Sequence, residues 1–225
     1  MALKFPIYLD HHATTPVDPR VVDAMAPYWS EDFGNASSAG HIFGWRAEEA
    51  VAIARERLAS AIGASDASEI VFTSGTTESD NLALIGLARG HRGHRDHLIT
   101  SAIEHPAVLD TCRFLVGEGF SWTILPVDGE GLVDPAAVEA AITDRTLAVS
   151  VMAANSEVGT LQPIEEIGRI CLERGVLLHT DAAQAVGKTP VDVQRWGVDL
   201  LSMCAISSTG RRASAHSTSG AGRRT

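Results

Sequence analysis

The sequence lacks the features that mark several classes of protein. No apolar run approaches the roughly 20 residues that a membrane-spanning helix needs, and the N-terminus turns polar too early for a secretory signal peptide. The three cysteines, Cys112, Cys171 and Cys204, are far apart and form no CxxC pair. Scattered cysteines are typical of reduced thiols, so we expect a cytoplasmic protein that does not enter a membrane.

Basic residues and nucleotide-binding motifs are also scarce. The formal net charge is −10, and the only lysines are Lys4 and Lys188. Such an acidic chain does not favour the phosphate backbone of nucleic acids. No GxGxxG or GxxxxGK[ST] motif occurs, and the nine histidines lack the paired spacing of a metal site. We therefore expect no nucleic acid, no metal and no Rossmann-type nucleotide site.

Residues 206–225 differ from the rest of the chain. They contain four arginines, no acidic residue and one large apolar residue, so residues 1–205 carry about −14. A segment with so little apolar surface cannot offset the entropy lost on ordering, and we expect it to be disordered.

Before this tail, short apolar runs alternate with helical periodicity. Candidate strands cover residues 69–73, 98–102, 122–127, 147–153, 176–179 and 200–203, and candidate helices cover residues 47–62, 78–88, 106–115, 135–142 and 163–174. The alternation predicts an α/β fold with a mainly parallel, doubly wound sheet. Ligands of such sheets bind at the carboxyl ends of the strands.

The first strand-to-helix junction runs through Thr73-Ser74-Gly75-Thr76-Thr77. Small residues before a helix leave backbone N–H groups and hydroxyls pointing at one place, which favours an anion site. A simple helix N-cap would explain the same residues.

Three further strand ends carry polar groups. His105 follows the second strand, although alone it could be a surface histidine; Asn155 lies in a polar turn after the fourth strand. Asp181 ends an almost wholly apolar strand, where an unpaired carboxylate is costly, and no Arg or Lys is close to it in sequence. The protonated ring nitrogen of pyridoxal 5′-phosphate (PLP) would be a suitable cation.

Several stretches together resemble the cysteine desulfurases, fold-type-I PLP enzymes of the class-V aminotransferase-like group. The resemblance covers residues 7 to about 205, in order and with matching intervals. The stretches are Tyr8–Pro16, Gly34–Ser38, Thr73–Asn81, Glu104–Pro106, Asn155–Gly159 and Asp181–Gln184.

The resemblance implies a role for each matching residue. Thr76 and Thr77 would bind the cofactor phosphate, and His105 would stack on the ring and move protons. Asp181 would pair with the ring nitrogen and Gln184 with the ring hydroxyl.

Other matches are looser. Asn155 would touch the ring, but Ser156 follows it where many relatives have a second asparagine. Asn35 and the residues around Ala13 would face the substrate.

The implied activity is removal of sulfur from L-cysteine, giving L-alanine and an enzyme persulfide. The sulfur would pass to an acceptor or scaffold protein for iron–sulfur cluster or thio-cofactor assembly. Members of this family are usually homodimers.

The chain departs from the family after Met203. By alignment, Ser207 occupies the position of the Schiff-base lysine and Ile206 that of the preceding histidine. A serine hydroxyl cannot replace that amine, and Lys188 is expected at the surface, so we expect this chain to be inactive.

A frameshift would explain the departure. Permitted codons from residue 206 onward, when translated from their third base, spell Lys-Phe-Tyr-Gly-Pro-Lys-Gly-Val-Gly-Ala-Leu-Tyr-Val-Arg-Arg, the family's lysine loop and next strand. We therefore expect residues 1–15 to be an N-terminal arm, 16–205 a partial PLP-binding large domain and 206–225 an out-of-frame tail. The last strand, the C-terminal small domain and its cysteine loop would be missing, leaving an incomplete sheet with an uncovered face or edge.

Two other functions are compatible with the sequence. The chain could derive from another class-V PLP enzyme, such as a selenocysteine lyase or an aminotransferase. It could also be a non-catalytic protein that binds PLP or a partner.

Overall fold

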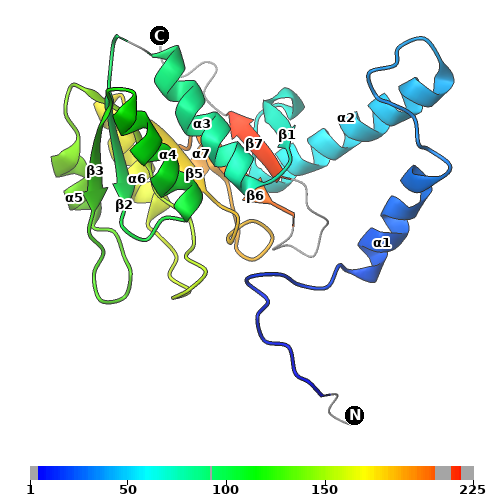
Figure 1. Cartoon of the computed structure of the whole chain (residues 1–225), viewed down its shortest axis with the longest axis horizontal. Helices are drawn as coiled ribbons and strands as arrows, with labels where there is room; N and C mark the ends of the chain where they lie inside the picture. Colours follow the sequence, from blue (N-terminus) through cyan, green and yellow to red (C-terminus); the bar gives the residue numbers. More distant parts are fainter. Residues whose placement is uncertain (1–4, 92, 206–213, 219–225) are drawn as a thin grey trace.

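A computed structural model describes residues 5–91, 93–205 and 214–218 of the chain. Its centre is a seven-stranded sheet with the order β1-β7-β6-β5-β4-β2-β3 (Figure 1). The strands are β1 (Ile70–Thr73), β2 (His97–Ser101), β3 (Ser121–Leu125), β4 (Thr146–Ser150), β5 (Leu177–Asp181), β6 (Leu200–Cys204) and β7 (Ser214–Thr218). Neighbouring strands from β3 to β6 are all parallel, and β7 runs antiparallel to both β6 and β1. The predicted mainly parallel sheet is confirmed.

Helices cover both faces of the sheet. The helices of the described residues are α1 (Pro19–Met25), which lies away from the sheet, α2 (Ile42–Ile62), α3 (Thr76–Gly90), α4 (Pro106–Gly117), α5 (Pro135–Ala141), α6 (Ile164–Arg174) and α7 (Val193–Trp196), with short 3-10 helices η1 (Ala26–Trp29) and η2 (Ala67–Glu69). One buried cluster lies under α3 and α4, and a larger one lies between the other face and α2, α5, α6 and α7. Because helices cover both faces, strands β2, β4, β5 and β6 are buried along nearly their whole length rather than at alternate residues, as is usual for parallel strands.

The predicted strands and the five predicted helices are present, with ends displaced by up to a few residues. The sequence did not predict α1, η1, η2 or α7, which have few or no buried residues and hence little apolar periodicity. Helix α1 still has clear local signals, an Asp18 side chain that caps Arg20 N–H and a proline in its first turn.

The C-terminal segment requires a correction. Ser214–Thr218 form β7 and pair with β1 and β6, although this stretch was predicted to be disordered and the sheet to lack its last strand. The reason is that β1 and β6 both present backbone groups to the gap between them, and a strand there satisfies both rows. Backbone pairing of this kind depends little on apolar side chains. The rest of the predicted tail, 206–213 and 219–225, lies outside the described residues.

The N-terminal part extends away from the sheet. Residues 5–41 and most of α2 project to one side of the body in Figure 1, and many of their large apolar side chains are exposed. No helix in the described ranges is long and apolar enough to cross a membrane.

Candidate functional site

A cavity of about 510 Å³ opens at the carboxyl ends of β1 and β5, where the sheet topology predicts a ligand site. Its volume is within the roughly 300–1,000 Å³ common for small-molecule sites. It is lined by His12, Ala13, Ser74, Gly75, Thr76, Thr77, His105, Ser156, Glu157, Asp181, Ala183, Gln184 and Cys204. Six of the predicted site residues therefore meet at one place, although they are separated by up to 171 positions in the sequence.

The N-terminus of α3 forms one wall. Gly75 is the N-cap and has no side chain to cap the helix, so it leaves the first-turn N–H groups uncapped where Thr76 and Thr77 line the cavity. A Cβ at Gly75 would meet nothing within 4 Å, which shows how open this position is. Ser74 donates from both its N–H and its hydroxyl to Glu78, each at 2.6 Å, and these bonds lower the pKa of Glu78. This wall suits an anion, because the helix dipole and the free N–H groups act together.

Asp181 forms the floor at the end of β5. Its side chain is buried and accepts a hydrogen bond from Ala183 N–H at 2.9 Å. Burial raises the pKa of Asp181, whereas the Ala183 bond and nearby His105 oppose the rise. A cation in the cavity would therefore stabilise its ionised form.

His105 is oriented by its own helix. It is the N-cap of α4, and its Nδ1 accepts the N–H of Ala107 at 3.1 Å. In the neutral ring the proton is then on Nε2, so the side chain that lines the cavity can donate from that nitrogen.

The N-terminal arm closes part of the cavity. Gln184 Nε2 donates to the His12 carbonyl at 3.3 Å, and His12 Nε2 lies 3.7 Å from Glu157 Oε1. These contacts hold Ala13 at the rim, on the side where the sequence predicted substrate contacts. Lys188 is exposed as predicted, but its Nζ donates to Gln184 Oε1 at 2.6 Å.

Two predicted residues do not line the cavity. Asn155 is buried and uses its amide to hold the loop, donating to Ile103 O and accepting from the N–H groups of Glu157 and Val158. Asn35 is exposed in the N-terminal region, where its Oδ1 accepts Ser37 N–H. Ser207, at the aligned lysine position, lies outside the described residues.

Glu157 and Cys204 in the lining were not predicted from the sequence, nor were three buried groups beneath it: Asp80, Glu104 and His179. One signal was available for Asp80, since it follows Thr76 by four positions and so lies one helical turn behind it on the same face. Nothing in the sequence indicated that Glu104 faces inward, because charged residues after a strand are usually exposed.

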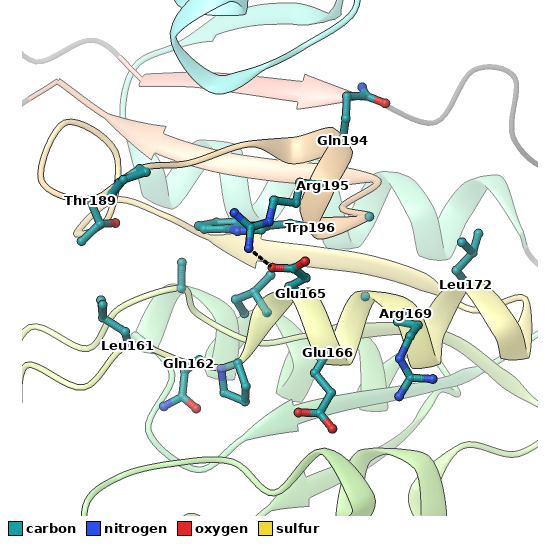
Figure 2. A pocket seen from close by; sticks show the side chains of 16 residues that line it. Leu161, Gln162, Glu165, Glu166, Arg169, Leu172, Thr189, Gln194, Arg195 and Trp196 are labelled. Carbon is teal, nitrogen blue, oxygen red and sulfur yellow. Dashed lines mark ion pairs between the residues drawn. The ribbon is translucent and has the colours of Figure 1, made fainter.

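A larger cavity, of about 920 Å³, lies elsewhere, between α6 and α7 (Figure 2). Its charged groups form surface pairs, such as Arg195 with Glu165 at 2.9 Å. The two helices approach closely at Gly168, where a Cβ would lie 1.8 Å from the Trp196 carbonyl oxygen. None of the groups of the first cavity lines it.

Comparisons with known proteins agree with this geometry. The family model of class-V aminotransferases matches residues 7–207. A cysteine desulfurase IscS of Anaeromyxobacter sp. (strain Fw109-5) is 55% identical over 203 residues, which are 90% of this chain and 50% of the relative. The solved structure of SspA in complex with cysteine has a TM-score of 0.91 at 41% identity and covers 95% of this chain and 61% of its own. A NifS-like protein has a TM-score of 0.92 at 38% identity, with 96% and 59% covered.

The chain therefore belongs to the class-V aminotransferase family, whose members use PLP. Within it, the relatives that the chain matches are cysteine desulfurases of the IscS type, which confirms the predicted family. The chain spans about half the length of these relatives.

The residues present fit PLP. The open N-terminus of α3 suits its phosphate, and the buried Asp181 carboxyl suits a protonated ring nitrogen. His105 lines the same cavity. The cavity thus offers an anion site and a cation site in one volume, which is the charge pattern of this cofactor.

Proposed function

We propose that this chain carries the cofactor-binding part of a cysteine desulfurase whose substrate is L-cysteine. One observation carries the proposal: the N-terminus of α3 and the buried Asp181 open into the same cavity. The substrate follows from the relatives, which are named cysteine desulfurases, and from the SspA structure, which was solved with cysteine.

The chain's own residues would bind and orient the cofactor. PLP supplies an electron sink that makes bonds at the substrate α-carbon easier to break. Thr76 and Thr77 would hold the phosphate, and Asp181 would keep a proton on the ring nitrogen. His105 would donate a hydrogen bond from Nε2 at the ring. Gln184 would contact the ring hydroxyl and, through the His12 carbonyl, hold the arm over the cavity.

Ser207 limits what this chain can do. With serine at the aligned lysine position, PLP would bind without a covalent bond to the protein. We therefore expect no release of sulfide and alanine from L-cysteine by the 225-residue chain. Ser207 therefore also favours the second candidate function, a non-catalytic PLP-binding protein.

The test is spectroscopic. PLP added to the purified chain should give a bound chromophore that dialysis removes and that borohydride does not fix to the protein. Covalent fixation would point to a substitute amine, with Lys188 beside Gln184 the first to examine. No binding at all would refute the cofactor site itself.

We also propose a homodimer in which the arm and α2 meet a second copy. The support is the set of exposed apolar side chains on the arm, on α2 and on the segment between them, including Leu9, Trp29 and Phe33 at 83%, 62% and 64% exposure. Light scattering on the purified chain tests this, and a monomer at all concentrations would contradict it. The sulfur acceptor and the cytoplasmic location stay predictions.

A further inference from the structure

A second aspartate is buried behind the floor of the cofactor cavity. Asp80, on α3, is fully buried against the sheet. Neither of its carboxyl oxygens makes a hydrogen bond of ordinary geometry among the described residues. No described lysine or arginine forms an ion pair with it, and its nearest possible cation is His179, whose Nε2 lies 3.6 Å from Oδ1. A buried carboxylate with no such compensation is very costly.

His179 connects Asp80 to the strand that carries Asp181. It stands two residues before Asp181 on β5, so both side chains point to the same face of the sheet. Its Nδ1 lies 2.8 Å from Ser150 Oγ and its Nε2 lies 3.1 Å from Ser202 Oγ. The imidazole is thus held in place by hydroxyls on β4 and β6.

The other groups around Asp80 are mostly acidic. Asp181 on β5 and Glu104, after β2, both raise the pKa of Asp80, and Ser202 on β6 opposes them. Glu104 is itself buried, and its Oε1 accepts from Ser101 Oγ and from Met152 N–H. On α4, Cys112 is an uncharged thiol whose pKa is raised by burial and then by Glu104. His105 acts on Asp181 from the cavity side.

Three buried carboxyl groups that act on one another electrostatically cannot all be ionised. Burial, with Asp181 as the second cause, raises the pKa of Asp80 to about 9. Asp181 differs from Asp80 in two respects: it receives the Ala183 N–H bond and it faces a cavity that can hold a cation.

We propose that Asp80 stays protonated behind Asp181 and is a positioning residue for the charge of the site: its neutrality leaves Asp181 as the carboxylate that ionises toward a cation in the cavity. The identity of that cation rests on the proposed function, but the protonation state of Asp80 does not. Because Asp80 lies one turn behind Thr76, α3 carries both the anion-binding end and the neutral acid of the floor.

The first experiment is a pH titration of aspartate carboxyl carbons by NMR on the chain without cofactor. Wild type should show an aspartate resonance that stays protonated through neutral pH and persists in Asp181→Asn, and Asp80→Asn should remove it. Asp181→Asn should lower its midpoint by about one pH unit or more, since a like charge is removed. Asp144→Asn, at an exposed site outside the cavity, should leave that resonance in place.

A resonance of Asp80 that is ionised at neutral pH would overturn the proposal, as would a midpoint that Asp181→Asn leaves unchanged. If Asp80→Asn does not fold, the infrared carbonyl band of a protonated carboxyl decides the question in Glu104→Gln with carboxyl-labelled aspartate, because the isotope shift assigns the band to an aspartate and the protonated Glu104 is removed. PLP binding is measured separately by absorbance. Failure to bind PLP refutes the proposed function and leaves the titration result standing.

Discussion

At the scale of single residues, the site depends on carboxyl groups whose burial is unusual. Asp181, Asp80 and Glu104 come from three separate segments and are each less than one-tenth exposed. The sequence predicted Asp181, because it ends an apolar strand, and missed Asp80 and Glu104. The difference is physical: a charge inside an apolar run is visible in the sequence, whereas the inward direction of a helix or loop side chain depends on what packs over it.

Asp181→Asn should weaken PLP binding at least ~10-fold, because an amide cannot compensate a protonated ring nitrogen in a buried site. Equilibrium titration of the chromophore at constant pH measures this. Asp144→Asn is the matched control and should bind like wild type, since Asp144 is exposed and outside the cavity. Equal affinity of Asp181→Asn and wild type would remove Asp181 from the cofactor site.

Stability should fall as the pH rises above the acidic range. Burial raises the pKa of Glu104 from 4.5 to about 8, so the folded chain binds more protons than the unfolded chain between those values. The stability that the protonated Glu104 contributes is fully present below about pH 4.5. It is lost as the pH rises toward 8, and the free energy of unfolding falls by up to about 1.4 kcal/mol per pH unit. The raised pKa of Asp80 also makes the free energy of unfolding fall as the pH rises, up to about pH 9.

Urea unfolding at pH 6 and pH 8 measures this loss. Glu104→Gln should reduce the difference between the two pH values, since glutamine keeps the acceptor for Ser101 and Met152 and does not titrate. Glu48→Gln, at an exposed position on α2, should not change it. A stability that is flat or rises between the two pH values would contradict the burial of Glu104 as a neutral acid.

At the scale of elements, the longer helices with a buried face were predicted, and the short ones with few or no buried residues were missed. Helix α6 has five buried residues at helical spacing and was predicted from them, whereas α1 has none. Close contacts between elements could not be predicted from the sequence either. Gly168 has no special backbone angle, and only the position of α7 explains why a glycine stands there.

Gly168→Ala should destabilise the chain by about 1–3 kcal/mol, because the new Cβ would overlap the Trp196 carbonyl oxygen and separate α6 from α7. Denaturant unfolding provides the measurement. Gly86→Ala on α3 is the control: a Cβ there meets nothing within 4 Å, and the change should stabilise by about 0.5–1 kcal/mol. Equal stability of the two variants would contradict the close approach of α6 and α7 at Gly168.

At the scale of the whole molecule, the sheet includes a strand that composition argued against. Strand β7 lies between β1 and β6, in the segment where the alternate reading frame places the strand after the lysine loop. The backbone groups of β1 and β6 define the gap that β7 fills, so a polar segment can form the same backbone hydrogen bonds as an apolar one. An apolar segment would bury more apolar surface and so stabilise the sheet more.

The frameshift makes a prediction about the gene. Sequencing across codons 204–225 and beyond should show a +2 frame that encodes the lysine loop and continues to a cysteine-bearing region. A chain corrected to that frame should bind PLP covalently and release alanine from L-cysteine. Codons for residues 206–219 that do not spell the alternate frame would exclude the frameshift and leave Ser207 as a genuine replacement.

The sequence by itself determined the family, the parallel sheet and the residues at its strand ends, because apolar periodicity and short polar junctions are local properties of the chain. Only the tertiary structure decided that Thr76, His105 and Asp181 share one cavity, that Asn155 and Asn35 do not line it, and that Asp80 and Glu104 are buried beneath it. These facts depend on which strands are neighbours and on what covers each face, and contacts between residues so far apart in sequence leave no pattern in it.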